Sequence, residues 1–209
     1  MANEKKRFID KAYDRDAFRD TKDFYAEWAE TYDEEVVGEH AYVQPQRCAE
    51  ALQTFGVPSS ARILDVGCGT GLSGQALLKA GFADIDGCDF SQEMLDKAAE
   101  KNIYNRLFLA DLNTPPLDSS DEAYDAAAAV GVFSFEHIDP NALDDVLRIL
   151  KPGASLVIGL NDHFYETGVL ETKLTSLEDD GVIEVLKREH GDHLPNFGVK
   201  GWLILLVKK

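Results

Sequence analysis

The chain has few cysteines and no long hydrophobic run, and these two shortages exclude several classes of protein. Its cysteines, Cys48, Cys68 and Cys88, are odd in number and lack a C-x-x-C spacing. We therefore expect neither a disulfide framework nor a zinc site, and we expect a reducing, cytoplasmic location. The longest apolar stretches, 126–133 and 202–207, are too short to span a bilayer. The first twenty residues are charged and lack the apolar segment of a secretory signal.

Positive charge is also scarce. The 209 residues include 21 Lys and Arg against 38 Asp and Glu, which gives a formal net charge of −17. A field of that sign repels phosphate backbones, and no run of Lys or Arg interrupts it, so we do not expect a nucleic-acid partner.

The rest of the chain alternates between strand and helix patterns. Strands are expected at 61–66, 84–89, 106–110, 125–132, 154–160, 182–190 and 201–208. Helices are expected at 71–80, 91–100, 139–150 and 166–180, with a turn at 151–153. This alternation predicts an α/β domain with a parallel sheet and helices on both faces.

Two helical segments are expected before the first strand. Apolar residues recur at helical spacing from Phe24 onwards, at Tyr25, Trp28, Ala29, Tyr32 and Val36. A second helix is expected to begin at Pro45, to bury Ala49, Leu52 and Phe55, and to end at Gly56.

The most informative stretch is ILDVGCGTG at 63–71. An apolar strand runs into a glycine turn, Gly67 to Gly71, and a helix pattern begins at once. Such a turn lets the backbone approach a ligand closely, and the helix N-terminus adds free N–H groups. Asp65 lies two residues before the first glycine. A carboxylate there suits a cofactor with a cationic amino group and a sulfonium better than it suits a phosphate.

A second phasing of the glycines must be weighed. Gly69, Gly71 and Gly74 spell G-x-G-x-x-G, and Asp89 comes about 20 residues later, as in dinucleotide-binding proteins. In that fingerprint the first glycine directly follows the strand, a place that Gly67 holds here. An NAD(P)-dependent oxidoreductase is therefore the less favoured alternative.

Several polar and glycine positions share one predicted location. Asp65–Gly71, Asp89, Asp111 and Gly131–Phe133 all fall at the carboxyl ends of predicted strands. Ligands of open α/β sheets bind at that edge, beside the first strand. Their common placement supports a binding site more strongly than any one residue does.

These motifs resemble those of the class I S-adenosylmethionine-dependent methyltransferases, over about residues 24–209. The resemblance rests on ILDVGCGTG, on Asp89, on Ala110-Asp111, and on LKPGASLVI at 150–158. The fuller pattern, with FYAEWAETYDEEV near the start and GWLILLVKK at the end, is similar to the Williams–Beuren-region methyltransferase-like group and its bacterial relatives.

The resemblance implies a Rossmann-like, doubly wound, mostly parallel seven-stranded sheet with an antiparallel C-terminal strand. We expect a single methyltransferase domain over 1–209. Within it, residues 1–20 would be loose, 21–58 would form a helical lid or cap, and 59–209 would form the Rossmann-like core. The implied cofactor is S-adenosyl-L-methionine, and its product is S-adenosyl-L-homocysteine.

The resemblance also implies cofactor contacts. Asp65 would receive the amino group of the methionine moiety, and Asp89 would accept from the two ribose hydroxyls. Asp111 would accept from the adenine amine. The remaining implied contacts are Gly67, Cys68, Gly69 and Gly71 in the turn, Phe90, Met94, Ala110 and Leu112 at the adenine, and Val130, Gly131 and Val132 beside the ribose and sulfonium. Tyr25, Trp28 and Tyr32 would form an aromatic lid, with Tyr32 nearest the sulfonium.

The acceptor is not identified by any motif. The Asn/Asp-Pro-Pro-Tyr of enzymes that methylate planar amino groups is missing after the fourth strand, where AVGVFSF stands. No metal-ligand cluster is present in the sequence either. By elimination we expect a small-molecule acceptor, with no nucleic-acid or membrane partner. Candidates for a catalytic base are His137, Asn161, His163 and Tyr32, and a cofactor-binding protein without transfer activity is the remaining alternative.

Overall fold

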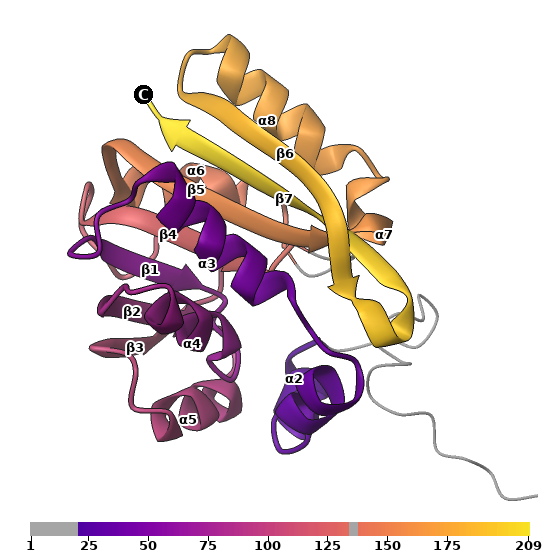
Figure 1. Cartoon of the computed structure of the whole chain (residues 1–209). Helices are drawn as coiled ribbons and strands as arrows, with labels where there is room; N and C mark the ends of the chain where they lie inside the picture. The colour runs from indigo at the N-terminus through magenta and orange to yellow at the C-terminus, as the bar shows by residue number, and fades with distance from the viewer. Residues whose placement is uncertain (1–20, 134–137) are drawn as a thin grey trace, which may run out of the picture.

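The structure, a computed structural model, describes residues 21–133 and 138–209. A seven-stranded sheet of order β3-β2-β1-β4-β5-β7-β6 forms the centre of the molecule (Figure 1). The strands are β1 (Arg62–Val66), β2 (Asp84–Asp89), β3 (Arg106–Leu109), β4 (Tyr124–Val130), β5 (Leu150–Asn161), β6 (Ile183–Leu194) and β7 (Val199–Lys208).

All neighbouring pairs from β3 to β5 are parallel, and β7 is antiparallel to both β5 and β6. The helical elements are α2 (Thr21–Trp28), the π-helix η1 (Glu34–Glu39), α3 (Gln44–Phe55), α4 (Leu72–Lys79), α5 (Gln92–Glu100), α6 (Ala142–Ile149), α7 (Asp162–Tyr165), α8 (Val169–Asp179) and the 3-10 turn η2 (Pro195–Phe197). The predicted Rossmann-like sheet with one antiparallel strand is confirmed.

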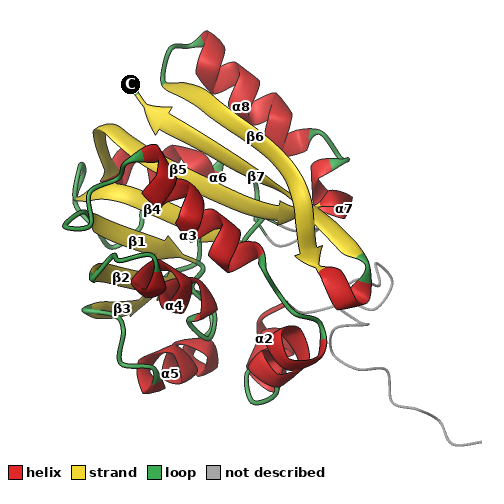
Figure 2. Cartoon of the chain, viewed as in Figure 1, coloured by secondary structure: helices red, strands yellow, loops and turns green. Residues whose placement is uncertain are grey.

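Helices cover both faces of the sheet because successive strand residues point to opposite sides. Ile63 of β1 packs in a core with residues of α3 and α4, whereas Leu64 packs in the larger core with residues of α6 and α8. Figure 2 shows α3 and α4 crossing the near face of the sheet. The strand ends therefore remain uncovered by these helices along the carboxyl edge, where the predicted site lies.

Local signals account for several helix boundaries. The Ser91 hydroxyl accepts from the Met94 backbone N–H at 3.3 Å and caps α5, as expected of a serine at that position. Pro45 stands in the first turn of α3, which ends at Gly56 with φ of 95°. Phe55, however, is 47% exposed, so the expectation that it is buried is wrong. It lies in the last turn of α3, beyond the part of the helix that faces the sheet.

Two other local expectations are also wrong. The helical spacing from Phe24 onwards does not give one helix, because α2 ends at Trp28 and a separate π-helix begins at Glu34. The segment Lys151–Gly153 is not a free turn but belongs to β5, whose register with β4 shifts between Tyr124 and Ala126. Pairing with a neighbouring strand gives this segment its extended conformation, and the local Pro-Gly sequence does not predict such pairing.

The β6–β7 hairpin reaches past the carboxyl edge of the sheet and packs against the N-terminal segment. Leu194 of the hairpin shares a small buried core with Trp28 and Val36, and Phe197 packs against it. In Figure 1 the end of the hairpin lies beside the segment that carries α2. Both segments thus border the strand ends from which the site is built.

Candidate active site

The glycine turn after β1 has the backbone that its sequence predicts. Gly67, Gly69 and Gly71 have φ values of 63°, 53° and 91°, a region that favours glycine. A Cβ at Gly67 would meet Val132 at 2.6 Å, whereas one at Gly69 would meet nothing within 4 Å. The turn is therefore packed against the segment after β4 on one side and is open at Gly69.

Asp65 lies fully buried behind this turn. One of its oxygens, Oδ2, accepts from the Ser73 hydroxyl and from the Tyr104 hydroxyl, each at 2.6 Å. The other oxygen, Oδ1, is buried and has no hydrogen-bond partner in the part of the chain that the structure describes. Burial raises the pKa of Asp65 to about 6, although the two hydroxyl donors oppose the shift. An unpartnered buried carboxylate oxygen is the acceptor that a cationic amino group requires.

Asp89 lies at the end of β2 and links the turn to the next helix. It accepts from the backbone N–H of Gly69 at 2.9 Å and from that of Ser91 at 3.0 Å. Burial raises its pKa, and the backbone N–H donors oppose that shift. The carboxylate thus sits next to the open glycine, where a hydroxylated ligand could reach it.

A third buried carboxylate shows how unusual these two are. Asp86 of β2 pairs with Arg62, whose guanidinium lies 2.7 Å from Asp86 Oδ2. By contrast, Asp65 and Asp89 have no ion-pair partner among residues 21–133 and 138–209. Buried carboxylates without a cation are costly, and this makes Asp65 and Asp89 the candidates for contact with a ligand.

Gly74 has a packing role that the sequence did not reveal. A Cβ there would collide with the Tyr104 side chain, and one at Gly87 would approach the same ring at 2.9 Å. Both glycines therefore let Tyr104 pass between α4 and β2 to reach Asp65. The need for space beside Tyr104 explains why Gly74, the third glycine of the apparent G-x-G-x-x-G, is a glycine, and a dinucleotide-binding role is not required. No motif contains Tyr104, and sequence reasoning missed it.

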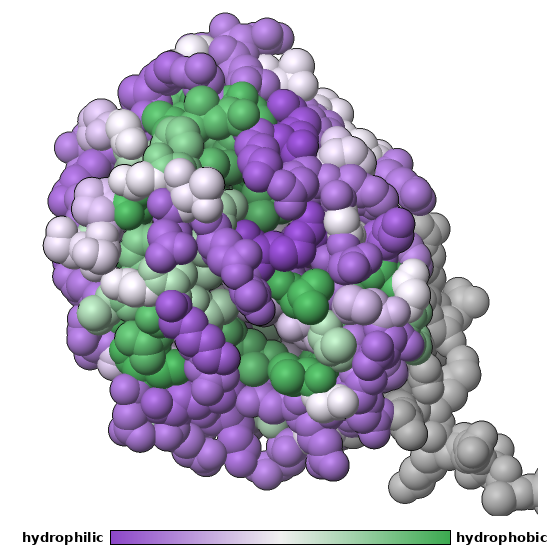
Figure 3. Space-filling view, in the orientation of Figure 1, coloured by the Kyte–Doolittle hydropathy of each residue, from purple (hydrophilic) through white to green (hydrophobic). Residues whose placement is uncertain are grey.

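The aromatic residues of the N-terminal segment lie over the end of β2. The Tyr25 ring packs edge-on against the Phe90 ring, with 6.0 Å between the ring centroids, and Trp28 packs against both Tyr25 and Tyr32. Burial, followed by the nearby charge of Asp89, raises the pKa of Tyr25 to about 12. Figure 3 shows apolar surface around a hollow near the middle of this face of the molecule.

The other predicted cofactor residues stand along the same edge. Val132 packs on Gly67, and Gly131 follows β4 with its N–H donating to the Gly159 carbonyl at 2.7 Å. Leu112 is buried, whereas Asp111 is exposed and accepts from the Asn113 backbone at 2.9 Å. The structure places the remaining predicted residues, Cys68, Met94, Ala110 and Val130, in or beside the buried layer next to them. Their proposed contacts with a cofactor remain predictions.

The four candidates for a catalytic base have different surroundings. Asn161 uses its side-chain oxygen to cap α7, accepting from the Phe164 N–H at 3.0 Å. His163 is exposed in the same short helix, and Tyr32 packs on Trp28. His137 lies outside the described residues. Helix capping and ring packing do not single out a proton acceptor, so the identity of a base stays a prediction.

Tyr42 and His193 border the carboxyl ends of β4 and β5, and sequence reasoning missed both. The Tyr42 hydroxyl lies 2.9 Å from the position of a Cβ on Gly131, and its ring contacts His193 at 5.0 Å. His193 is buried, and its Nδ1 has no hydrogen-bond partner among the described residues. Burial, followed by the Arg47 charge, lowers the pKa of His193 to about 4, so the ring is neutral near pH 7.

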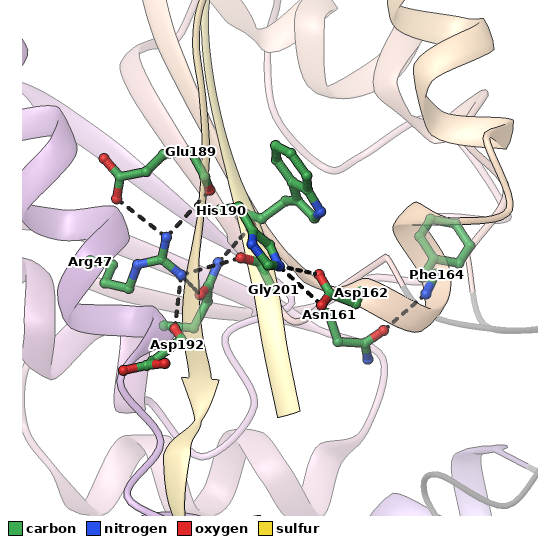
Figure 4. Close-up of polar contacts among 10 residues, drawn as sticks. Arg47, Asn161, Asp162, Phe164, Glu189, His190, Asp192 and Gly201 are labelled. Atoms are coloured by element: carbon green, nitrogen blue, oxygen red, sulfur yellow. Dashed lines mark hydrogen bonds and ion pairs between the residues drawn. The ribbon is translucent and has the colours of Figure 1, made fainter. Parts of the chain in front are cut away.

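Arg47 of α3 fixes the hairpin that carries His193. Its guanidinium donates to the Gln44 side chain and the Asp192 carbonyl, each at 2.8 Å, and lies 3.2 Å from a Glu189 carboxylate oxygen (Figure 4). On the other face of the hairpin His190 lies 3.0 Å from both oxygens of Asp162. These contacts tie β6 and β7 to α3 and α7, and so set the distance of the hairpin from the strand ends.

A separate hollow of about 730 Å³ lies between the loop after β3, the start of α6 and helix α8. Asn113, Asp139 and Phe164 are among its lining residues. No residue of the glycine turn lines this hollow, so the hollow is separate from the site that contains Asp65 and Asp89.

Comparison with known proteins identifies the family. Residues 63–153 match a methyltransferase domain family. Over 185 residues the chain is 35% identical to the human methyltransferase-like protein 27, and the match covers 86% of this chain and 74% of that protein. The chain belongs to the class I S-adenosylmethionine-dependent methyltransferases.

Other comparisons agree with that assignment. The demethylmenaquinone methyltransferase of Tropheryma whipplei is 35% identical over 115 residues, which are 52% of this chain and 45% of that protein. A Methanococcus maripaludis structure assigned to the S-adenosyl-L-methionine-dependent methyltransferases has a TM-score of 0.67 at 20% identity, and covers 92% of this chain and 97% of that one. The resemblance seen in the sequence is confirmed, and with it S-adenosylmethionine as the cofactor.

The residues of this methyltransferase fit that cofactor. The unpartnered Asp65 Oδ1 suits its amino group, the buried Asp89 suits two hydroxyls, and the open side of Gly69 leaves the backbone accessible. No helix among the described residues has both the length and the apolar character needed to cross a membrane.

Proposed function

We propose that the methyltransferase binds S-adenosylmethionine along the carboxyl ends of β1 to β4 and transfers its methyl group to a small-molecule acceptor. The observation that carries the proposal is the pair Asp65 and Asp89, two buried carboxylates that have no ion-pair partner among the described residues and flank an open glycine turn. A cofactor with an ammonium group at one end and a ribose in the middle supplies a donor for the unpartnered Asp65 Oδ1, and hydroxyls that can bond to the Asp89 carboxylate beside its backbone donors.

The bound cofactor supplies an activated methyl group on a sulfonium, whose departure needs no acid. The chain must therefore hold an acceptor in line with that methyl group and keep water away. The Tyr25, Trp28 and Tyr32 rings cover the site from the N-terminal segment and Val132 closes it below Gly67. The ring faces also suit a positively charged sulfonium.

The acceptor site would lie next to Gly131, between Tyr42 and the hairpin. Tyr42 offers a hydroxyl close to the end of β4, and neutral His193 stands against its ring. Because the hairpin and the N-terminal segment pack together through Leu194 and Trp28, the approach is bounded on two sides. This enclosure, together with the net charge of −17, supports a small molecule over an RNA. The demethylmenaquinone methyltransferase is a relative whose name likewise indicates a small acceptor.

The cofactor part of the proposal is tested by calorimetry. S-adenosylhomocysteine should bind with a micromolar dissociation constant and NAD should give no heat, and each ligand can be checked by thermal shift. Binding of NAD with no binding of S-adenosylhomocysteine would refute the cofactor site.

The acceptor part is tested with methyl-labelled S-adenosylmethionine and a cell extract that is separated into small-molecule, RNA and protein fractions. Label should appear in the small-molecule fraction. Label confined to RNA would overturn the acceptor class. Cofactor binding without label in any fraction would favour a cofactor-binding protein without transfer activity.

A further inference from the structure

A polar cluster joins the N-terminal segment to the glycine turn. Asp33 Oδ1 accepts from the Thr70 hydroxyl at 2.5 Å, and Asp33 Oδ2 accepts from the Lys101 ammonium at 2.6 Å. The same ammonium donates to the Thr70 carbonyl at 2.5 Å. We call Asp33, Thr70 and Lys101 the Asp33 latch. It closes a ring of contacts among three segments that are far apart in the chain.

None of the three side chains makes a hydrogen bond within its own local segment. Asp33 occupies the position before η1 but makes no capping bond to that helix. Thr70 is 2% exposed inside the turn, between the two glycines Gly69 and Gly71. Lys101 follows α5, and its aliphatic chain passes 3.3 Å from the position of a Cβ on Gly71. The cluster therefore fixes the N-terminal segment to the backbone that would carry the cofactor.

The same segment covers the ribose end of the proposed site. Tyr25 contacts Phe90, directly after Asp89, and α2 contacts α5. The segment 21–39 is thus held by aromatic packing at Phe90, by the core that it shares with Leu194, and by the latch at Thr70. The rings of this segment pack beside Phe90 at the end of β2, so a change in its position would alter access to the proposed cofactor site.

We propose that Asp33 is a positioning residue, whose carboxylate holds segment 21–39 closed over the glycine turn and so slows release of the cofactor. This inference rests on the cofactor site proposed above. Hydrogen bonds between charged groups are short and stronger than neutral ones. The Lys101 side chain is 15% exposed and the Asp33 side chain 43%, so water screens this pair less than it screens the more exposed Glu30–Lys97 pair.

The chain offers a matched control for the latch. Glu30 lies in the same segment and pairs with Lys97 of α5 at 3.1 Å, but its side chain is 76% exposed and it pairs with no residue of the turn. Exposed pairs of this kind contribute little. Replacing Glu30 removes a negative charge from the same segment without removing the latch.

The test measures the affinity and dissociation rate of S-adenosylhomocysteine and S-adenosylmethionine in Asp33→Ala, Lys101→Met and Glu30→Gln. We expect Asp33→Ala and Lys101→Met each to lower the affinity for both ligands about tenfold through faster dissociation. The affinity of Glu30→Gln should stay within about twofold of the wild-type value. The double variant should lose little more than either single one, because both break the same contact. Only S-adenosylmethionine carries the sulfonium charge. An equal loss of affinity for the two ligands therefore indicates the latch and not a long-range effect of charge on the sulfonium.

Hydrogen exchange supplies a second readout that does not depend on transfer. With S-adenosylhomocysteine bound, amides of 21–39 should exchange at least about fivefold faster in Asp33→Ala than in the wild type, while α3 stays unchanged. Wild-type affinity and dissociation in both latch variants would overturn the proposal. If the wild-type protein binds no S-adenosylhomocysteine, the proposed cofactor site is refuted, and the proposed role of the latch is refuted with it. Should Asp33→Ala unfold, Lys101→Met decides by the same criteria.

Discussion

The two halves of the carboxyl edge are built in different ways. At β1 and β2 the site consists of short stretches of consecutive residues, Asp65 to Gly71 and Asp89 to Ser91, that bind one another through backbone groups. At β4, β5 and the hairpin it consists of single side chains from distant segments, such as Tyr42 and His193. The first half is specified largely by consecutive residues, with Tyr104 reaching Asp65 from a distant segment. The second half depends on how the whole chain packs.

This difference predicts where substitutions should act. Changes at β1 and β2 should alter cofactor affinity and the pH dependence of stability. Changes around the hairpin should alter folding stability or acceptor use and leave cofactor affinity nearly intact. The cofactor half should show the larger effects, because its carboxylates are proposed to contact the ligand directly.

Asp89→Ala should weaken binding of S-adenosylhomocysteine about a thousandfold, because it removes two charge-assisted hydrogen bonds of roughly 2 kcal/mol each. Calorimetry gives the affinity. Asp84→Ala is the control at the other end of the same strand, where Asp84 accepts from the Asn105 side chain, and it should change affinity less than about twofold. Unchanged affinity in Asp89→Ala would contradict the assignment of the ribose site.

Asp65 should make the protein less stable as pH rises. Its pKa is about 6 in the folded state against an ordinary value of 3.8, so the folded state holds the proton more tightly than the unfolded chain. The favourable contribution is complete below pH 4 and is lost as pH rises to 6, by about 3 kcal/mol. Urea unfolding between pH 4 and 7 should show this fall in the wild type relative to Asp65→Asn. Parallel stability profiles for the two proteins would count against it.

Arg47→Ala should lower the free energy of unfolding by about 2 kcal/mol, since it leaves the Asp192 carbonyl and the Gln44 side chain without their donor. Chemical denaturation measures it. Arg188→Ala is the control on β6, the strand that Arg47 contacts from α3. The Arg188 side chain pairs with Glu171 and is 34% exposed against 16% for Arg47, so this change should cost less than about 1 kcal/mol. A loss in Arg47→Ala as small as the one expected for Arg188→Ala would show that the hairpin does not depend on the Arg47 contacts.

His193→Phe should change the affinity for S-adenosylhomocysteine less than about twofold, because His193 contacts Tyr42 and not the glycine turn. Such a change is below about 0.5 kcal/mol. Transfer of label to the small-molecule fraction should fall in the same variant, while Asp89→Ala loses both binding and transfer. A loss of tenfold or more in affinity would place His193 in the cofactor half and erase the distinction between the halves.

The accuracy of the sequence predictions follows the same division. The strands, the glycine turn and the Ser91 cap could be predicted because each depends on neighbouring residues. The predictions for Phe55 and the N-terminal helix are wrong, because helical spacing does not reveal where a helix leaves the sheet or is interrupted. Tyr104, Tyr42 and His193 lie in no motif, so no spacing could have indicated them.

The sequence by itself determined the fold class, the family and the cofactor, because the glycine turn and the carboxylates at the strand ends are written in consecutive residues. The tertiary structure alone decided which carboxylates have partners. Asp86 meets Arg62, Asp65 meets Tyr104 but no cation among the described residues, and Asp33 reaches Thr70 across 37 positions. The physical reason is that burial and pairing depend on segments brought together by the sheet, and a charged residue has the same letter whether or not it finds a partner.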